Sequence, residues 1–207
     1  MKELKKIAKN LRGSYQGTDR FINIVVPHFR PYLNYLKGKD VVDVGSNAGL
    51  ISCEIAKIAN SCIGVEPHEK YYKQSLITKN FIKDKCIFVN ETIDQFSNRS
   101  DIPYNALFAS NVLYHLSDKG IEAIRKILKN CDTVLFFSRE NKPKKKNKFK
   151  LHHWKNIQEF LKNEGFKTSV LTDESKIVKF VSSHKNINRG AETKHTSSVW
   201  IPVLGIR

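Results

Sequence analysis

The chain has 207 residues, of which 40% are hydrophobic, and this is enough for one domain with a real core. Its formal net charge of +16 attracts phosphate groups, whether on RNA, DNA or anionic lipid. No apolar run reaches the roughly 18 to 20 residues that a transmembrane helix needs, so we expect no membrane partner. The basic N-terminus lacks the apolar stretch of a secretory signal, which favours a cytoplasmic location.

The order of the elements is readable from the spacing of apolar residues. Residues 1–38 have helical periodicity, and Pro27 and Pro31 are expected to kink or split this N-terminal helical extension. After it, short apolar runs typical of strands alternate with helical patterns. The expected strands are 40–44, 62–66, 86–89, 105–110, 132–138, 167–172 and 177–182. The expected helices are 49–59, 68–82, 118–129 and 151–163.

This alternation predicts an α/β fold with a doubly wound, Rossmann-like sheet. The first five strands are apolar on both faces, as a parallel sheet covered by helices requires. The last two are separated only by DESK, so they can pair antiparallel. We therefore expect seven strands, mostly parallel, with a C-terminal antiparallel hairpin in a domain of residues 39–184. The tail, 185–207, has no assigned role. Its segment VWIPVLGI could be an added edge strand, a lid or a dimer contact, and Pro202 argues against a central strand there.

Cysteine and histidine spacing gives no sign of a metal site or a disulfide. The chain has no C-x-x-C pair, and each cysteine lies within an apolar stretch. We expect buried free thiols at Cys53, Cys62, Cys86 and Cys131. His152 and His153 are adjacent but lack a third ligand at a useful spacing, so no metal is expected.

The stretch VVDVGSNAGL, residues 41–50, predicts a ligand-binding turn between a strand and a helix. Gly45 and Gly49 bracket the turn, and glycine permits positive φ and close approach of a ligand. The spacing differs from the G-x-G-x-x-G of dinucleotide-binding enzymes. Asp43 precedes the turn, and an acid there would repel a pyrophosphate. It would suit a ligand with a cationic ammonium, such as the methionine part of S-adenosylmethionine.

A second acid, Glu66, ends the next expected strand, 23 residues after Asp43. A carboxylate at this place can accept hydrogen bonds from both hydroxyls of a ribose. Acids at the tips of two adjacent parallel strands fit one adenosine-containing ligand. The alternative is that each acid only caps the helix that follows it.

Together with CIGVEP, YNALFASNVLYHL, DTVLFFSRE and HHWKNIQEFLKNEGF, these motifs resemble class I S-adenosylmethionine-dependent methyltransferases over about residues 38–183. The resemblance implies S-adenosylmethionine as donor, S-adenosylhomocysteine as product, and a seven-stranded sheet. The donor-binding positions that it implies are Asp43, Gly45, Ser46, Asn47, Gly49, Glu66, Glu91, Thr92 and Ser110. Asn47 replaces the usual middle glycine, and asparagine tolerates left-handed conformations. Asn105 replaces the acid that often begins strand four.

The segment SNVLYHLSD follows the fourth expected strand, where open α/β sheets place ligands. Asn111, Tyr114 and His115 are therefore the candidate catalytic residues. His115 could act as a general base for a hydroxyl or a neutral amine, or simply pack under the next helix. Methyl transfer from a sulfonium mainly requires alignment, so a dedicated base is not obligatory.

A basic loop follows the fifth expected strand, with six lysines within residues 142–150. Cations for phosphates, with aromatic residues nearby for stacking, are expected around a nucleic-acid strand. The expected substrate-binding residues are Arg139, Lys144, Lys145, Lys146 and His153. Two other interpretations stay open: a solvated loop without a partner, and a lysine excess that reflects an A/T-biased genome.

A narrower resemblance covers about residues 38–118, through GKDVVDVGSNAGLISCEIAK, CIGVEPHEKYYKQ and SNVLYHLSD. It is to enzymes that modify the wobble uridine of tRNA with a carboxymethyl group from a carboxylated S-adenosylmethionine. The glycine turn and EP are also similar to sugar and small-metabolite O-methyltransferases. The expected function is thus an RNA methyltransferase, with tRNA as a candidate acceptor. The alternatives are a small-molecule O- or N-methyltransferase and a non-catalytic binding module of the same fold.

Overall fold

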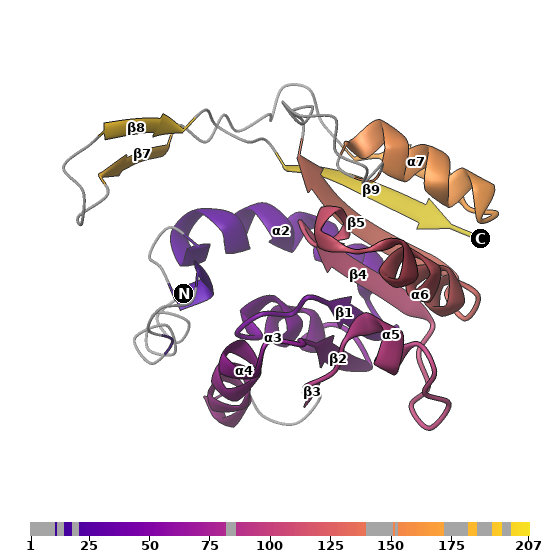
Figure 1. Ribbon diagram of the computed structural model, residues 1–207, viewed down its shortest axis with the longest axis horizontal. Helices are drawn as coiled ribbons and strands as arrows, with labels where there is room; N and C mark the ends of the chain where they lie inside the picture. The colour runs from indigo at the N-terminus through magenta and orange to yellow at the C-terminus, as the bar shows by residue number, and fades with distance from the viewer. Residues whose placement is uncertain are drawn as a thin grey trace.

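The computed structural model describes residues 11, 15–17, 21–81, 86–139, 151, 153–171, 182–185, 192–195 and 200–207. At its centre is a seven-stranded sheet of order β3-β2-β1-β4-β5-β9-β6 (Figure 1). The strands are β1 (Asp40–Val44), β2 (Ser61–Val65), β3 (Cys86–Val89), β4 (Ala106–Ser110), β5 (Thr133–Arg139), β6 (Lys167–Val170) and β9 (Trp200–Ile206). A separate antiparallel pair consists of β7 (Ser182–Lys185) and β8 (Glu192–His195).

Strands β1 to β5 are parallel, and β9 runs antiparallel to both of its neighbours. Successive strand residues point to opposite faces, so Val41 belongs to one buried cluster and Val42 to the other. Both faces are therefore covered, and the predicted doubly wound sheet with a C-terminal antiparallel pair is confirmed. All four cysteines are buried free thiols, as expected.

Helices pack on both faces of this sheet (Figure 1). One cluster contains side chains from η2 (Phe21–Val25), α2 (Val26–Leu33), η3 (Asn34–Leu36) and α3 (Leu50–Ala56), with α4 (Glu69–Phe81) beside it. The other contains side chains from α5 (Ile93–Phe96), η4 (Leu113–His115), α6 (Asp118–Leu128) and α7 (Trp154–Asn163). In the described part of the chain, none of the helices combines the length and apolar character needed to cross a bilayer.

The two prolines do not split the helical segment that precedes β1. The segment runs without a break from Phe21 to Leu36 while it changes from π- to α- to 3-10 geometry. Pro27 is the second residue of α2, next to the change from π- to α-geometry, and Pro31 lies inside α2. The helix expected in residues 1–10 lies outside the described residues.

The seventh strand of the sheet is β9, in the segment expected to be a tail. The strand expected at 177–182 is outside the described residues up to 181, and Ser182 begins β7. Because β9 lies between β5 and β6, the inference that Pro202 excludes a central strand is wrong. The division of the chain into domains at residues 38 and 184 stays a prediction.

Pro202 is tolerated because its missing N–H faces the end of β6. Its carbonyl accepts a hydrogen bond from Leu171 N at 3.0 Å. The N–H and C=O of one strand residue face the same neighbouring strand, so the absent N–H also points toward Leu171. The last β6–β9 pair is Val170 with Val203, so Pro202 lies one residue beyond that ladder.

The C-terminal residue ties β9 to the ends of two helices. The guanidinium of Arg207 donates hydrogen bonds to the carbonyls of Leu128 at 3.1 Å, Cys131 at 3.3 Å and Glu164 at 2.8 Å. It also lies 4.3 Å from the centre of the Phe166 ring. A cation at this place satisfies carbonyls that a helix leaves without partners at its C-terminus.

We therefore expect Arg207→Ala to lower the free energy of unfolding by about 1 to 2 kcal/mol, since it removes charge-assisted hydrogen bonds at a partly exposed site. Arg207→Lys should be intermediate, because an ammonium keeps the charge but cannot donate in a planar fork. Urea unfolding followed by circular dichroism measures both. Wild-type stability in the alanine variant would contradict this role.

Candidate functional site

The turn after β1 has a backbone that few residue types adopt. Gly45, Asn47 and Gly49 have φ angles of 72°, 53° and 79°. A Cβ at Gly45 would lie 2.7 Å from Cγ2 of Val112, and one at Gly49 would lie 2.4 Å from Cζ of Phe88. Glycine is thus needed at both positions for backbone and space, while asparagine tolerates the left-handed region at position 47.

Glu66 follows β2 directly and holds this turn in place. It is 7% exposed; its Oε2 accepts a hydrogen bond from Asn47 N at 2.8 Å, and its Oε1 accepts one from His68 N at 2.9 Å. An ionised carboxylate has about four acceptor sites, so each oxygen can accept one more hydrogen bond. Glu66 can therefore support the loop and still receive two hydroxyl groups.

Asp43 lies in the neighbouring strand and is 2% exposed. Its Oδ2 accepts a hydrogen bond from Ser52 Oγ at 2.5 Å. Burial is the main cause that raises the pKa of Asp43 to about 7; the Ser52 bond lowers this pKa, and the charge of Glu66 raises it. Near neutral pH the Asp43 carboxyl is partly protonated, and a cation beside it would favour the ionised form.

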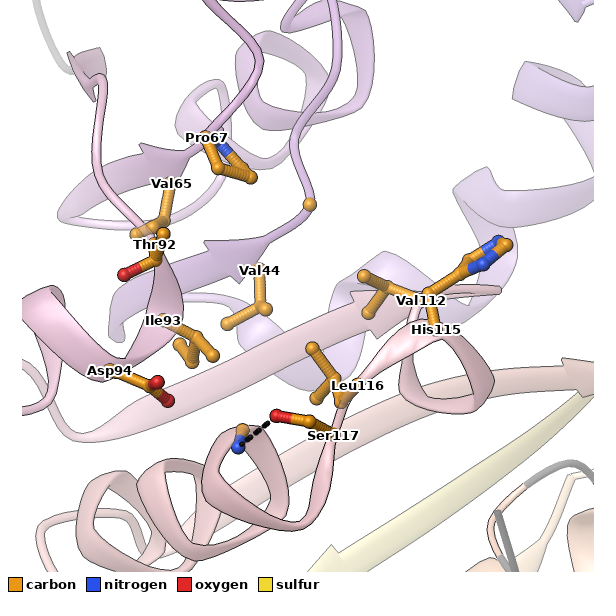
Figure 2. A pocket seen from close by; sticks show the side chains of 12 residues that line it. Val44, Val65, Pro67, Thr92, Ile93, Asp94, Val112, His115, Leu116 and Ser117 are labelled. Carbon is orange, nitrogen blue, oxygen red and sulfur yellow. Dashed lines mark hydrogen bonds between the residues drawn. The ribbon is translucent and has the colours of Figure 1, made fainter. Parts of the chain in front are cut away.

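A pocket of about 300 Å³ lies at the carboxyl ends of β1, β2 and β4 (Figure 2). Thr92, Ile93 and Asp94 lie on one side of it and Val112, His115 and Leu116 on the other. The lining is mainly apolar, which suits a flat heterocyclic ring with a few polar edges. The pocket adjoins both Gly45 and the residues flanking Glu66.

The tip of β4 also has the features of a ligand site. Asn111 has a φ of 55°, its backbone N donates to Phe137 O at 3.0 Å, and its Nδ2 donates to Ser110 Oγ at 3.3 Å. Within the described residues, neither the buried Asn111 Oδ1 nor the buried Ser46 Oγ has a hydrogen-bond partner. Buried polar atoms without partners beside a left-handed backbone leave capacity for a polar ligand.

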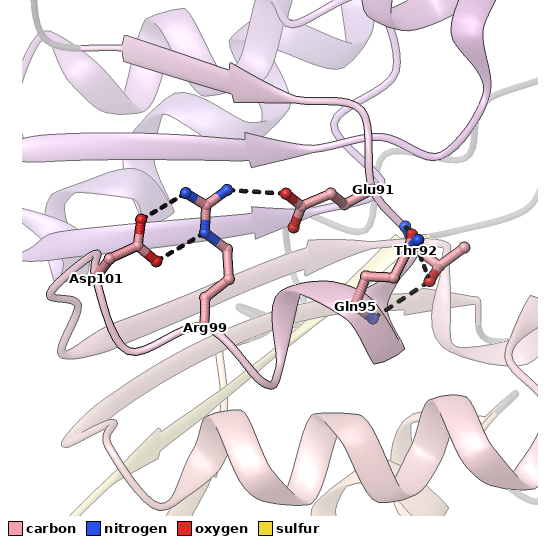
Figure 3. A network of polar contacts seen from close by, with 5 residues as sticks. All are labelled: Glu91, Thr92, Gln95, Arg99 and Asp101. Atoms are coloured by element: carbon pink, nitrogen blue, oxygen red, sulfur yellow. Dashed lines mark hydrogen bonds and ion pairs between the residues drawn. The ribbon is translucent and has the colours of Figure 1, made fainter.

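Glu91, one of the expected donor-binding residues, does not line the pocket. Its Oε1 lies 2.8 Å from Nη1 of Arg99, which also pairs with Asp101 at 2.6 Å (Figure 3). The carboxylate of Glu91 thus already has a charged partner within the chain.

Thr92, another of the expected donor-binding residues, lines the pocket and is the N-cap of α5. Its hydroxyl accepts from Gln95 N while the Gln95 side chain accepts from Thr92 N, which is a capping box. This T-x-x-Q pattern is a recognisable start of a helix. It would have placed Asp94, a pocket residue that the sequence analysis missed, in the first turn of α5.

Of the other candidates, His115 is exposed and lines the pocket from η4. The side chains of Tyr114 and Arg139 lie outside the described ones, and Lys144, Lys145 and Lys146 lie outside the described residues. His153 is the N-cap of α7, where its Nδ1 accepts from Lys155 N at 3.2 Å. Among described residues, no group of three or more His, Cys, Asp or Glu could hold a metal ion.

No protein-family model matches the sequence. Among curated proteins, a tRNA U34 carboxymethyltransferase from Campylobacter lari is 29% identical over 148 residues. The match covers 65% of this chain and 50% of that protein, so it spans about half the length of the relative.

Several solved structures are similar to this chain in overall fold. The DhpI complex with S-adenosylmethionine and HEP has a TM-score of 0.63, 11% identity, and coverage of 100% of this chain and 95% of that chain. Magnesium protoporphyrin IX methyltransferase from Synechocystis PCC 6803, with bound S-adenosylmethionine, has a TM-score of 0.58 at 14% identity. The match covers 100% of this chain and 90% of that chain. A methyltransferase from Archaeoglobus fulgidus has a TM-score of 0.59 at 17% identity, with coverage of 89% of this chain and 94% of that chain. The chain therefore has the fold of the S-adenosylmethionine-dependent methyltransferases, as its sequence motifs predicted.

Proposed function

We propose that this chain is an S-adenosylmethionine-dependent methyltransferase that modifies RNA, with tRNA as the favoured acceptor. The observation that carries the donor part is the buried Glu66 carboxylate. Its Oε2 holds the left-handed glycine turn through Asn47 N, and the residues on either side of it, Val65 and Pro67, line an apolar pocket at the carboxyl edge of a parallel sheet. Proteins of this fold have been crystallised with S-adenosylmethionine or S-adenosylhomocysteine, which supports the same donor here.

The residues present fit this donor. The two free acceptor sites of Glu66 match the two hydroxyls of a ribose, and the pocket beside Pro67 and Val112 matches an adenine ring. We assign the ammonium of the amino-acid end to Asp43, which lies two residues before Gly45 and is buried beside the turn, outside the lining of the pocket. When bound, the donor supplies a methyl group already activated on a sulfonium. The chain then has to align donor and acceptor and exclude water, and His115 is placed to take a proton from an acceptor that must lose one.

Two observations support RNA as the acceptor. The net charge of +16 favours a polyanion, and the Campylobacter lari relative is by name a tRNA-modifying enzyme. A small-molecule acceptor is the second candidate, because a protein of the same fold is named for magnesium protoporphyrin IX. The two candidates differ in their response to salt, since only a polyanion releases many counterions on binding.

Replacing Glu66 by Gln should weaken binding of S-adenosylhomocysteine by roughly 10- to 100-fold, because hydrogen bonds to a charged acceptor are worth about 1.5–3 kcal/mol each. Isothermal calorimetry measures this affinity. Glu69→Gln is the matched control, since Glu69 is exposed on α4 and pairs only with Lys73 among the described residues, at 2.6 Å. Equal affinity of the Glu66→Gln variant and the wild type would argue against the ribose role.

Binding of S-adenosylhomocysteine should strengthen as the pH rises through about 7. The pKa of Asp43 is raised to about 7, so the ionised form that attracts an ammonium becomes fully populated only above that pH. Below it, the association constant should fall up to tenfold for each pH unit. Asp43→Asn should bind more weakly and with a flatter pH profile. If Asp43→Asn showed the same pH dependence of affinity as the wild type, Asp43 would have no part in binding the donor.

Incubation with S-adenosylmethionine and total RNA should produce one modified nucleoside, identified by mass spectrometry, and the added mass distinguishes methyl from carboxymethyl. Joint replacement of Lys144, Lys145 and Lys146 by Ser should lower turnover on RNA roughly tenfold at 0.15 M salt, with S-adenosylhomocysteine affinity retained. Salt-insensitive activity on a free metabolite would select the small-molecule candidate. A folded protein that binds no donor would select a non-catalytic module.

A further inference from the structure

A glutamine from the segment before the sheet is hydrogen-bonded to the glycine turn. Gln16 is 7% exposed; its Nε2 donates to the carbonyl of Ser46 at 3.0 Å, and its Oε1 accepts from Leu50 N at 2.8 Å. The side-chain amide thereby acts as both donor and acceptor to backbone groups of the turn. Its two contacts bracket residues 47–49, the tip of the turn.

The backbone of the turn needs such support from elsewhere in the chain. Three of its five residues have left-handed φ angles, a conformation that the chain does not favour by itself. The N-cap of α3, Gly49, has no side chain to satisfy the first N–H groups of the helix. The carboxamide of Gln16 does this for Leu50, from 34 positions earlier in the sequence.

The position of Gln16 is itself constrained by close packing. A Cβ on the next residue, Gly17, would lie 2.4 Å from the carbonyl oxygen of Leu11. Leu11 is 1% exposed and belongs to the core cluster that also contains α3. The chain thus passes close to itself at Gly17, and the buried Leu11 packs directly beside the residue that follows Gln16.

We propose that Gln16 is a positioning residue for the donor. It sets the conformation of residues 46–50 and through it the affinity for the amino-acid end of the donor, the end that the proposed function assigns to Asp43. This inference rests on the proposed function. Since the ribose and the adenine are assigned to Glu66 and the apolar pocket, loss of the Gln16 contacts should affect one end of the donor more than the other.

The test compares two ligands, S-adenosylhomocysteine and 5′-methylthioadenosine, which keeps the nucleoside but lacks the amino-acid end. Gln16→Met keeps the length of the side chain and removes both hydrogen bonds. It should weaken S-adenosylhomocysteine about tenfold and 5′-methylthioadenosine less than about twofold in calorimetry. Gln16→Glu keeps an acceptor for Leu50, but its charged oxygen would face the carbonyl of Ser46 at a buried site, so its loss at neutral pH should be at least as large as that of Gln16→Met.

Arg207→Ala is the control for general destabilisation, because Arg207 lies at the opposite end of the strands from the glycine turn. It should leave both affinities unchanged, and thermal unfolding verifies that each variant is folded. Equal weakening of both ligands by Gln16→Met, or no weakening of either, would overturn the positioning role while the wild type still binds. Failure of the wild type to bind S-adenosylhomocysteine would instead overturn the proposed function, and this inference with it.

Discussion

The hydrogen bond from the backbone of Asn47 to the carboxylate of Glu66 is the contact on which the candidate site depends. It joins the turn after β1 to the tip of β2, and the second carboxylate oxygen receives the N–H of His68. A turn with alternate left-handed residues is unfavourable by itself, so it needs fixed partners. These partners belong to the chain itself, so a ligand that uses Glu66 does not have to supply them, and its binding requires less ordering.

The second carboxylate, Asp43, differs from Glu66 because, among the described residues, its oxygens accept no backbone hydrogen bond that supports the turn. It is buried with a hydroxyl as its partner, and its pKa is raised from 3.8 to about 7. The folded state therefore holds a proton that the unfolded chain releases, so this group stabilises the fold below about pH 3.8 and that contribution is lost as the pH rises to about 7. A bound ammonium would remove this cost at neutral pH. An acid that weakens the free protein at neutral pH is thus suited to a cationic ligand.

The sequence was sufficient where local pattern and the fold agree. The apolar runs located β1 to β5, and both acids followed from the position of strand ends. The sequence was insufficient where the environment of a residue depends on a partner far away in the chain. The proline rule fails at Pro202 because the neighbouring strand ends at Val170, which no local pattern indicates. The ion pair of Glu91 with Arg99 likewise depends on how the chain turns after α5, while the expected donor role of Glu91 stays a prediction. Gln16 contacts a loop 30 residues away in the sequence, and no sequence motif predicts this contact.

The segment before the sheet supports the site on two sides. Through Gln16 it contacts the glycine turn, and through α2 it packs Phe29 against Phe137, with ring centres 4.3 Å apart. The carbonyl of Phe137 accepts the backbone N–H of Asn111, so the same packing supports the left-handed tip of β4. Gly45 of the turn and Val112, which follows this tip, both line the same pocket. Residues before β1 therefore belong to the architecture of the site, because both of its left-handed segments are supported from there.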